Sequence, residues 1–118
     1  MKLDVFKDVV AEALDGLPDV FKKSIENVEI VIEDGAPVDI MASHPGSLIL
    51  GLYQGVPMKH RGHYYAGVLP DKISIYRNAI TSVSTSKEDM IDNIRKTLLH
   101  EIGHYYGITD KKLRELGY

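Results

Sequence analysis

The spacing of apolar residues near the start of the chain predicts two helices. The positions that share a helical spacing are Val5, Phe6, Val9, Val10, Ala13 and Leu14. Gly16 ends this run, so the pattern predicts an amphipathic helix of about three turns. Pro18, a residue favoured at a helix start, is followed by Val20 and Phe21 and predicts a short second helix that ends near Ser24.

Three later segments have the pattern of strands, and two loops separate them. The segment Val28–Glu33 is rich in β-branched residues, Leu48–Gln54 is mostly apolar, and Lys72–Arg77 alternates cleanly. Residues 35–47 carry prolines and glycines and few large apolar groups, and residues 57–67 are rich in His, Tyr and Gly. Both of these segments are therefore predicted as loops.

The last long element is predicted to be a helix that begins after Ser86 and ends near Tyr106. Ser86 is followed by acidic residues in the pattern of an N-terminal cap. The apolar stripe of this helix consists of Ile91, Ile94, Leu98, Ile102 and Tyr105. At about 100° per residue, His100 and His104 project away from the stripe, while Glu101 falls between the stripe and the histidines.

Composition restricts the classes of function that remain. The chain has 118 residues, which fits a single domain spanning residues 1–118, and 44% of them are hydrophobic, as in an ordinary globular protein. Its net charge is −3. Its basic residues are scattered, so no nucleic-acid partner is expected. It contains no cysteine, so any metal must be held by His, Asp or Glu. No apolar run suits a signal peptide or a membrane span, so we expect a cytoplasmic protein with no membrane partner.

The chemistry of the chain is concentrated in the motif HExxHxxGxxD, formed by His100, Glu101, His104, Gly107 and Asp110. Two imidazoles four residues apart on a helix share a face and can bind one metal ion, and the glutamate beside them can take a proton from water. The glycine permits the left-handed turn that ends a helix. Asp110 can then return to the same ion, which leaves a fourth position open, as in a catalytic zinc site.

Each motif residue also has a structural interpretation. The two histidines could lie on the surface of an amphipathic helix, and Glu101 could form a helical salt bridge. Asp110 precedes Lys111, so it could instead cap a final helix that spans residues 110–116. The third ligand would then come from elsewhere or be a water molecule.

The extended motif resembles that of the zincin metallopeptidases, with aspartate in place of the third histidine of metzincins. The likeness continues in GLYQGVP (51–57), RGHYY (61–65), LPDKISIYR (69–77) and TLLHEIGHYYGITD (97–110), which resemble the small bacterial proteins called minimal zincins. The resemblance implies an α+β, zincin-like fold: a small mixed sheet of three to four strands packed with an N-terminal helix and a C-terminal active-site helix. It also implies one Zn²⁺ per chain, bound by His100, His104 and Asp110, with Glu101 as the catalytic base.

The function that we expect from this resemblance is zinc-dependent hydrolysis of peptide bonds in peptides or unstructured proteins. Candidates for a group that stabilises the oxyanion are His63, Tyr64, Tyr65, Tyr76, Arg77 and Tyr106. If the Lys72–Arg77 strand lies at a sheet edge, a substrate could pair with it as a further strand. Otherwise it is an ordinary strand paired on both sides. Whether two copies form a homodimer is left open by the sequence.

Two other functions compete with peptide hydrolysis. The larger metzincins have a methionine-containing turn, and no methionine follows Asp110 here. The cleft could therefore be incomplete, and the protein a non-catalytic zinc-binding or regulatory module. Metal-dependent endoribonucleases of the rRNA-maturation type have similarly spaced histidines. Those enzymes have glycine where this chain has Glu101 and histidine where it has Asp110, which counts against the ribonuclease interpretation.

Overall fold

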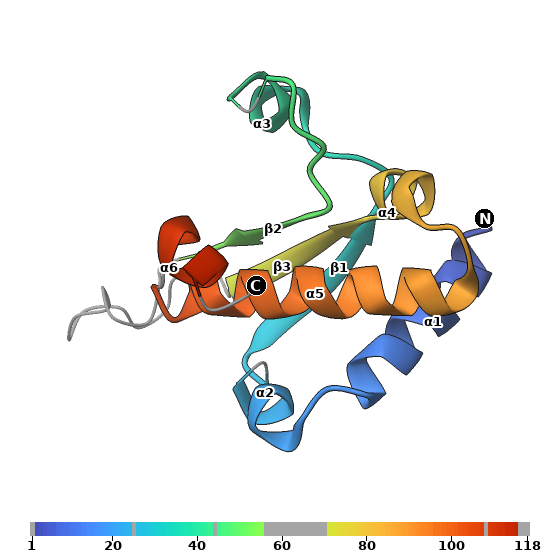
Figure 1. The fold of residues 1–118 in the computed structure, drawn as a ribbon, viewed down its shortest axis with the longest axis horizontal. Helices are drawn as coiled ribbons and strands as arrows, with labels where there is room; N and C mark the ends of the chain where they lie inside the picture. The colour runs from blue at the N-terminus through green and yellow to red at the C-terminus, as the bar shows by residue number, and fades with distance from the viewer. Residues whose placement is uncertain (1, 25, 44, 56–70, 108, 116–118) are drawn as a thin grey trace.

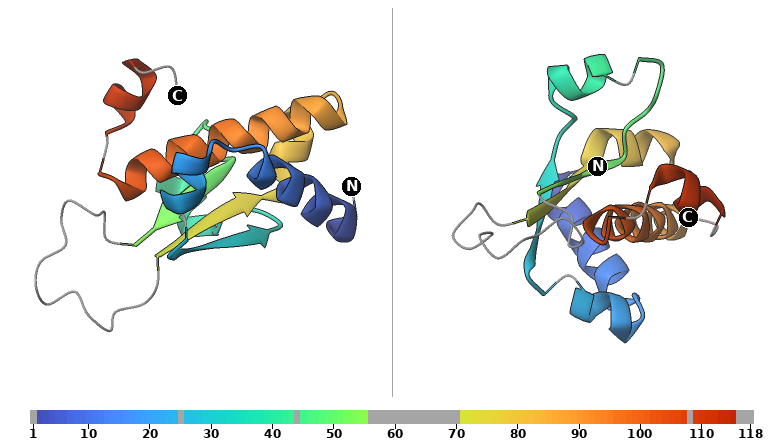
Figure 2. Two further views of the ribbon diagram at one scale, coloured as in Figure 1. Left: turned by 90° about the horizontal axis from the view of Figure 1, so that it is seen from below. Right: turned by 90° about the vertical axis from the view of Figure 1, so that its left-hand side faces the viewer.

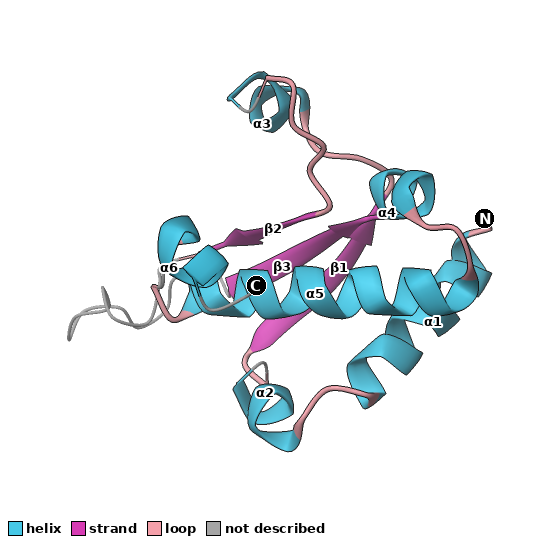
Figure 3. Ribbon diagram, in the orientation of Figure 1, coloured by secondary structure: helices cyan, strands magenta, loops and turns pink. Residues whose placement is uncertain are grey.

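The part of the chain that the structure describes contains six helices and three strands (Figure 1, Figure 3). The structure is a computed structural model, and it describes residues 2–24, 26–43, 45–55, 71–107 and 109–115. The elements are α1 (Leu3–Asp15), α2 (Asp19–Ser24), β1 (Val28–Glu33), α3 (Val38–Ser43), β2 (Gly51–Gln54), β3 (Asp71–Tyr76), α4 (Arg77–Val83), α5 (Lys87–Tyr105) and α6 (Asp110–Glu115). This mixed α+β architecture confirms the predicted fold class. Among the described helices, none is both long and apolar enough to cross a membrane.

The central strand of the sheet is β3. The strand order is β1-β3-β2, with β1 parallel and β2 antiparallel to β3. The strand predicted at Lys72–Arg77 is therefore hydrogen-bonded along both sides, and it offers no free edge to a substrate. The edge next to the motif helix belongs to β2 instead. Alternation along a strand reports which faces are buried, and it carries no information about which strands lie beside it.

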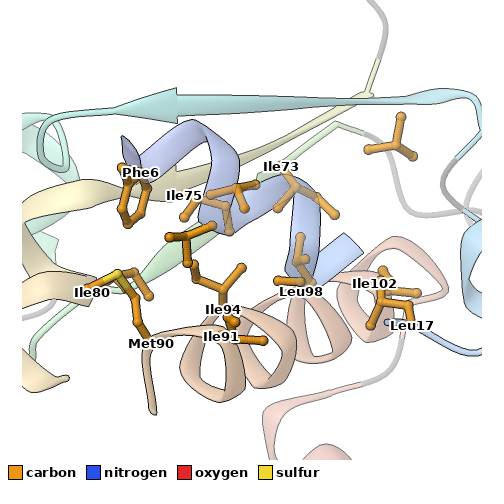
Figure 4. Packing of buried hydrophobic residues seen from close by; sticks show 14 of the residues in the cluster. Phe6, Leu17, Ile73, Ile75, Ile80, Met90, Ile91, Ile94, Leu98 and Ile102 are labelled. Carbon is orange, nitrogen blue, oxygen red and sulfur yellow. The ribbon is translucent and has the colours of Figure 1, made fainter. Parts of the chain in front are cut away.

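The core lies between the sheet and the pair α1 and α5, which cover one face of the sheet (Figure 1, Figure 2). Figure 4 shows the apolar side chains of α1, β3, α4 and α5 meeting there. Its fully buried members include Phe6, Ile73, Ile75, Ile80, Ile94 and Leu98. Burial of such side chains contributes roughly 1.5–3 kcal/mol each, so this cluster fixes α5 against the sheet.

Two short helices, α3 and α4, were not predicted. Helix α4 consists mainly of β-branched and hydroxyl residues, which favour helices weakly. It forms because Ile80 is fully buried and because the Asn78 amide donates to the Asp34 carbonyl oxygen at 3.0 Å. Helix α3 lies in the predicted loop of residues 35–47, contains no buried residue and stands away from the sheet (Figure 1).

The strand β2 is shorter than predicted. Residues 48–50, predicted as its first part, are not in a strand, although the Leu50 carbonyl oxygen still accepts a hydrogen bond from the Tyr76 amide at 3.0 Å. This segment connects α3 with β2 above α5 (Figure 1). Residues 47–50 line a cleft together with residues of α5, the helix that carries the motif.

Candidate metal centre

The helix α5 positions the motif and begins and ends as the sequence predicts. The Ser86 hydroxyl oxygen accepts a hydrogen bond from the Asp89 amide at 3.0 Å, which caps the first turn. At the other end, Gly107 has a φ of 79° and donates its amide to the His104 carbonyl oxygen at 2.8 Å. The left-handed conformation predicted for Gly107 is thus confirmed. It turns the chain three residues after the second histidine, at the end of α5.

The structure brings His100, Glu101 and His104 together. One ligand atom from each lies within 4.8 Å of the others. The two imidazole rings have centroids 4.7 Å apart at an interplanar angle of 70°. Both histidine side chains are about one-quarter exposed, at 28% and 29%, whereas the side chain of Glu101 is only 6% exposed. The predicted arrangement, with histidines facing out and the glutamate partly held by packing, is the one observed.

The carboxylate of Glu101 is held by the neighbouring strand. The Tyr53 amide of β2 donates to Oε1 of Glu101 at 2.7 Å, and Nδ1 of His104 lies 3.3 Å from the same oxygen. A hydrogen bond to an ionised carboxylate is stronger than one between neutral groups. This bond therefore fixes the orientation of Glu101 and joins α5 to β2.

The close approach of β2 to α5 depends on Gly51. A Cβ atom at this position would lie 2.6 Å from Cγ2 of Thr97 and 2.8 Å from the carbonyl oxygen of Ser74. Both distances are too short for real contacts, so only glycine fits without a shift. The absence of a side chain here lets β2 come near enough to bind Glu101.

A cleft of about 410 Å³ opens over the three motif residues. This volume lies in the range of known ligand pockets. One wall is aliphatic and is formed by Ile40, Leu48, Ile49, Leu50 and Leu52, with Ser47 and Gly51 between them. The other wall is the polar face of α5, formed by Asn93, Lys96, Thr97, His100, Glu101 and His104.

The donor set fits a zinc ion. Zinc binds imidazole nitrogens at about 2.0–2.1 Å, so two donors on one ion lie at most roughly 4 Å apart. The candidate atoms of His100, Glu101 and His104 lie within 4.8 Å of one another, which suits two imidazoles on one ion with the Glu101 carboxylate beside it. Two imidazoles and carboxylates without any thiolate form a set that zinc accepts readily.

The third predicted ligand, Asp110, is the first residue of α6. Its side chain lies outside the described part of the structure, so its role as a ligand stays a prediction. The alternative in which Asp110 caps this helix depends on the same side chain and likewise stays a prediction. Within the described residues, Oγ1 of Thr109 is a capping oxygen for the first turn of α6. That oxygen accepts the Lys112 amide at 3.2 Å.

The structure separates the candidates for oxyanion stabilisation. Arg77 forms an ion pair with Asp34 at 2.6 Å, and Tyr76 is 1% exposed; neither lines the cleft. Burial, followed by the charge of Glu33, raises the pKa of Tyr76 above its ordinary value. Tyr106 is 41% exposed directly after α5. The remaining candidates, His63, Tyr64 and Tyr65, lie outside the described residues.

Comparison with known proteins identifies the family. The family described as zincin-like metallopeptidases matches residues 25–118. The chain belongs to this family. A solved structure of a conserved hypothetical protein from T. thermophilus is similar in fold, with a TM-score of 0.55 and 22% sequence identity over 98% of this chain and 97% of that chain. No protein of curated function matches.

Sequence reasoning did not identify three residues that shape the site of this zincin-like protein. Gly51 and Tyr53 act through a backbone approach that follows from the strand order, for which the sequence has no local signal. Lys96 had a signal. It precedes His100 by four positions, as His100 precedes His104, and that spacing places all three on one helical face.

Proposed function

We propose that this protein is a zinc-dependent peptidase that cleaves extended peptides. The observation that carries the proposal is the cluster of His100, Glu101 and His104 on the wall of a cleft. Membership of the zincin-like metallopeptidases supports the same reaction. His100 and His104 would hold the ion, together with Asp110.

The bound ion would polarise a substrate carbonyl and lower the pKa of water at the site. Glu101 would act as the general base. Its Oε1 is occupied by the Tyr53 amide at 2.7 Å, while Oε2 lies 4.0 Å from Nε2 of His100. We infer that Oε2 takes the proton of the attacking water and later gives it to the leaving amine.

None of the described strands pairs with the outer edge of β2, which supports an extended substrate. Leu50 bonds to β3 through its carbonyl oxygen, so the amides and carbonyls of Gly51 and Tyr53, at alternate positions, point to the other side. The Tyr53 amide is used by Glu101. The backbone groups of Gly51 would then pair with a peptide lying in the cleft, which is the role that the sequence suggested for the Lys72–Arg77 strand.

The substitution Glu101→Gln tests the proposal. Glutamine keeps an oxygen that accepts the Tyr53 amide but cannot act as a base at neutral pH. We expect it to retain zinc content and melting temperature and to lose at least about 100-fold in cleavage of a mixed peptide library, read by mass spectrometry. Glu29→Gln, at an exposed position of β1, is the matched control and should cleave normally.

Two results would contradict the proposal. Equal cleavage by the Glu101→Gln protein would show that the observed cuts come from another source. No cleavage by unsubstituted protein that holds one zinc ion would instead favour a non-catalytic zinc-binding module.

A further inference from the structure

The charges on the wall of the cleft are arranged unequally. Among the described residues that line it, Glu101 is the only acid and Lys96 the only lysine or arginine. Glu101 is buried and already accepts the Tyr53 amide. Lys96 is exposed. The accessible fixed charge along this part of the cleft is therefore positive, although the whole chain has a net charge of −3.

Lys96 forms no ion pair within the described part of the chain. Three other lysines do, since Lys72 pairs with Glu33 at 3.6 Å, Lys87 with Glu12 at 3.3 Å and Lys112 with Glu115 at 4.0 Å. The ammonium group of Lys96 is thus available to a molecule in the cleft.

The position of Lys96 along α5 sets its distance from the metal site. It lies one helical turn before His100, about 6 Å along the helix axis. Successive residues of an extended peptide are roughly 3.4 Å apart. In a peptide that runs along α5, Lys96 would therefore lie beside a residue about two positions away from the bond to be cleaved next to His100 and His104.

We propose that Lys96 is a specificity-determining residue that binds a carboxylate of the substrate about two residues from the cleaved bond. The inference rests on the proposed peptidase function. The aliphatic wall opposite, which includes Leu48 and Leu50, reduces access of water to the ion pair and so strengthens it. The carboxylate is either an Asp or Glu side chain or the C-terminus of a short peptide.

Binding and cleavage of matched peptides test this inference separately. Binding is measured by fluorescence anisotropy with zinc-loaded Glu101→Gln protein, which prevents turnover. One arm compares Asp with Asn at each position of C-terminally amidated peptides. The other arm compares free-acid with amidated peptides that have no acidic side chain, so the two arms distinguish the source of the carboxylate.

We expect the carboxylate form to bind about threefold to fivefold more tightly in one arm, as for a partly exposed ion pair. The additional substitution Lys96→Gln should abolish this difference and Lys96→Glu should reverse it. Lys87→Gln removes a charge from the same helix outside the cleft and should leave the difference unchanged. The ratio of kcat/KM for the same peptide pairs with the catalytically active protein should change in the same direction.

The inference is overturned if no peptide binds, if neither arm shows a preference, or if the preference survives Lys96→Gln, since the carboxylate would then bind the metal directly. These results differ from those that would contradict the peptidase proposal. Cleavage without a carboxylate preference rejects only the role of Lys96. A Lys96-dependent preference in binding without any cleavage rejects only the peptidase.

Discussion

The contact between Gly51 and α5 can be tested by adding one methyl group. In Gly51→Ala the new Cβ would lie 2.6 Å from Cγ2 of Thr97 and 2.8 Å from the carbonyl oxygen of Ser74, well inside the 3.4 Å at which ordinary contacts begin. The Ser74 oxygen belongs to the central strand and cannot rotate away. We therefore expect β2 to move away from α5 and the 2.7 Å bond from Tyr53 to Glu101 to lengthen.

The magnitude follows from these two effects. Overpacking of a dense contact costs about 1–3 kcal/mol, and loss of a hydrogen bond to a charged group costs about 1.5–3 kcal/mol. Since part of the shift relieves the overpacking, we expect the free energy of unfolding to fall by about 2–4 kcal/mol in total. Without such a contact, Gly→Ala usually stabilises a protein by about 0.4–1 kcal/mol at a compatible site. The sign of the change in the free energy of unfolding therefore already shows whether the contact exists.

Urea unfolding at neutral pH measures the change, with two further variants for comparison. Gly35→Ala is the matched control, because a Cβ at Gly35 has nothing within 4 Å; its free energy of unfolding should stay the same or rise by up to about 1 kcal/mol. Thr97→Ser removes the Cγ2 methyl group and should recover about 1 kcal/mol in the double variant. If Gly51→Ala were as stable as Gly35→Ala, the described packing of β2 on α5 would be refuted.

Two further predictions concern the helix end and the buried tyrosine. Gly107 has a φ of 79°, so Gly107→Ala should lower the free energy of unfolding by about 1 kcal/mol and weaken zinc binding. Gly107→Asn, which tolerates this conformation, should lose less in urea unfolding and zinc titration; equal losses would contradict the explanation. The pKa of Tyr76 is raised above 10.0 by burial and then by Glu33, so its contribution to stability is fully present below pH 10 and is lost as the pH rises through the folded pKa. Urea unfolding should therefore show that the Tyr76→Phe protein loses less stability between pH 9 and pH 11 than the unsubstituted protein does. An identical loss would show that the pKa of Tyr76 is not raised in the folded state.

The local features of the site could be predicted from the sequence because they depend on neighbours along the chain. The stripe of α5 placed His100 and His104 on its outer face and Glu101 between them and the core, and burial agrees. Ser86 and Gly107 mark the ends of this helix through backbone preferences that each residue has by itself. The segment Val28–Glu33 forms a strand with the predicted bounds for the same reason.

The tertiary structure alone decided what surrounds these residues. The order of strands, with β3 central and β2 beside α5, results from pairings between segments far apart in the chain, and alternation within a strand does not encode it. From that order follow the hydrogen bond from Tyr53 to Glu101 and the cleft wall opposite Lys96. The sequence thus determined which groups carry the chemistry, because helical spacing is local. The fold decided what holds and faces them, because those contacts exist only after distant segments have packed together.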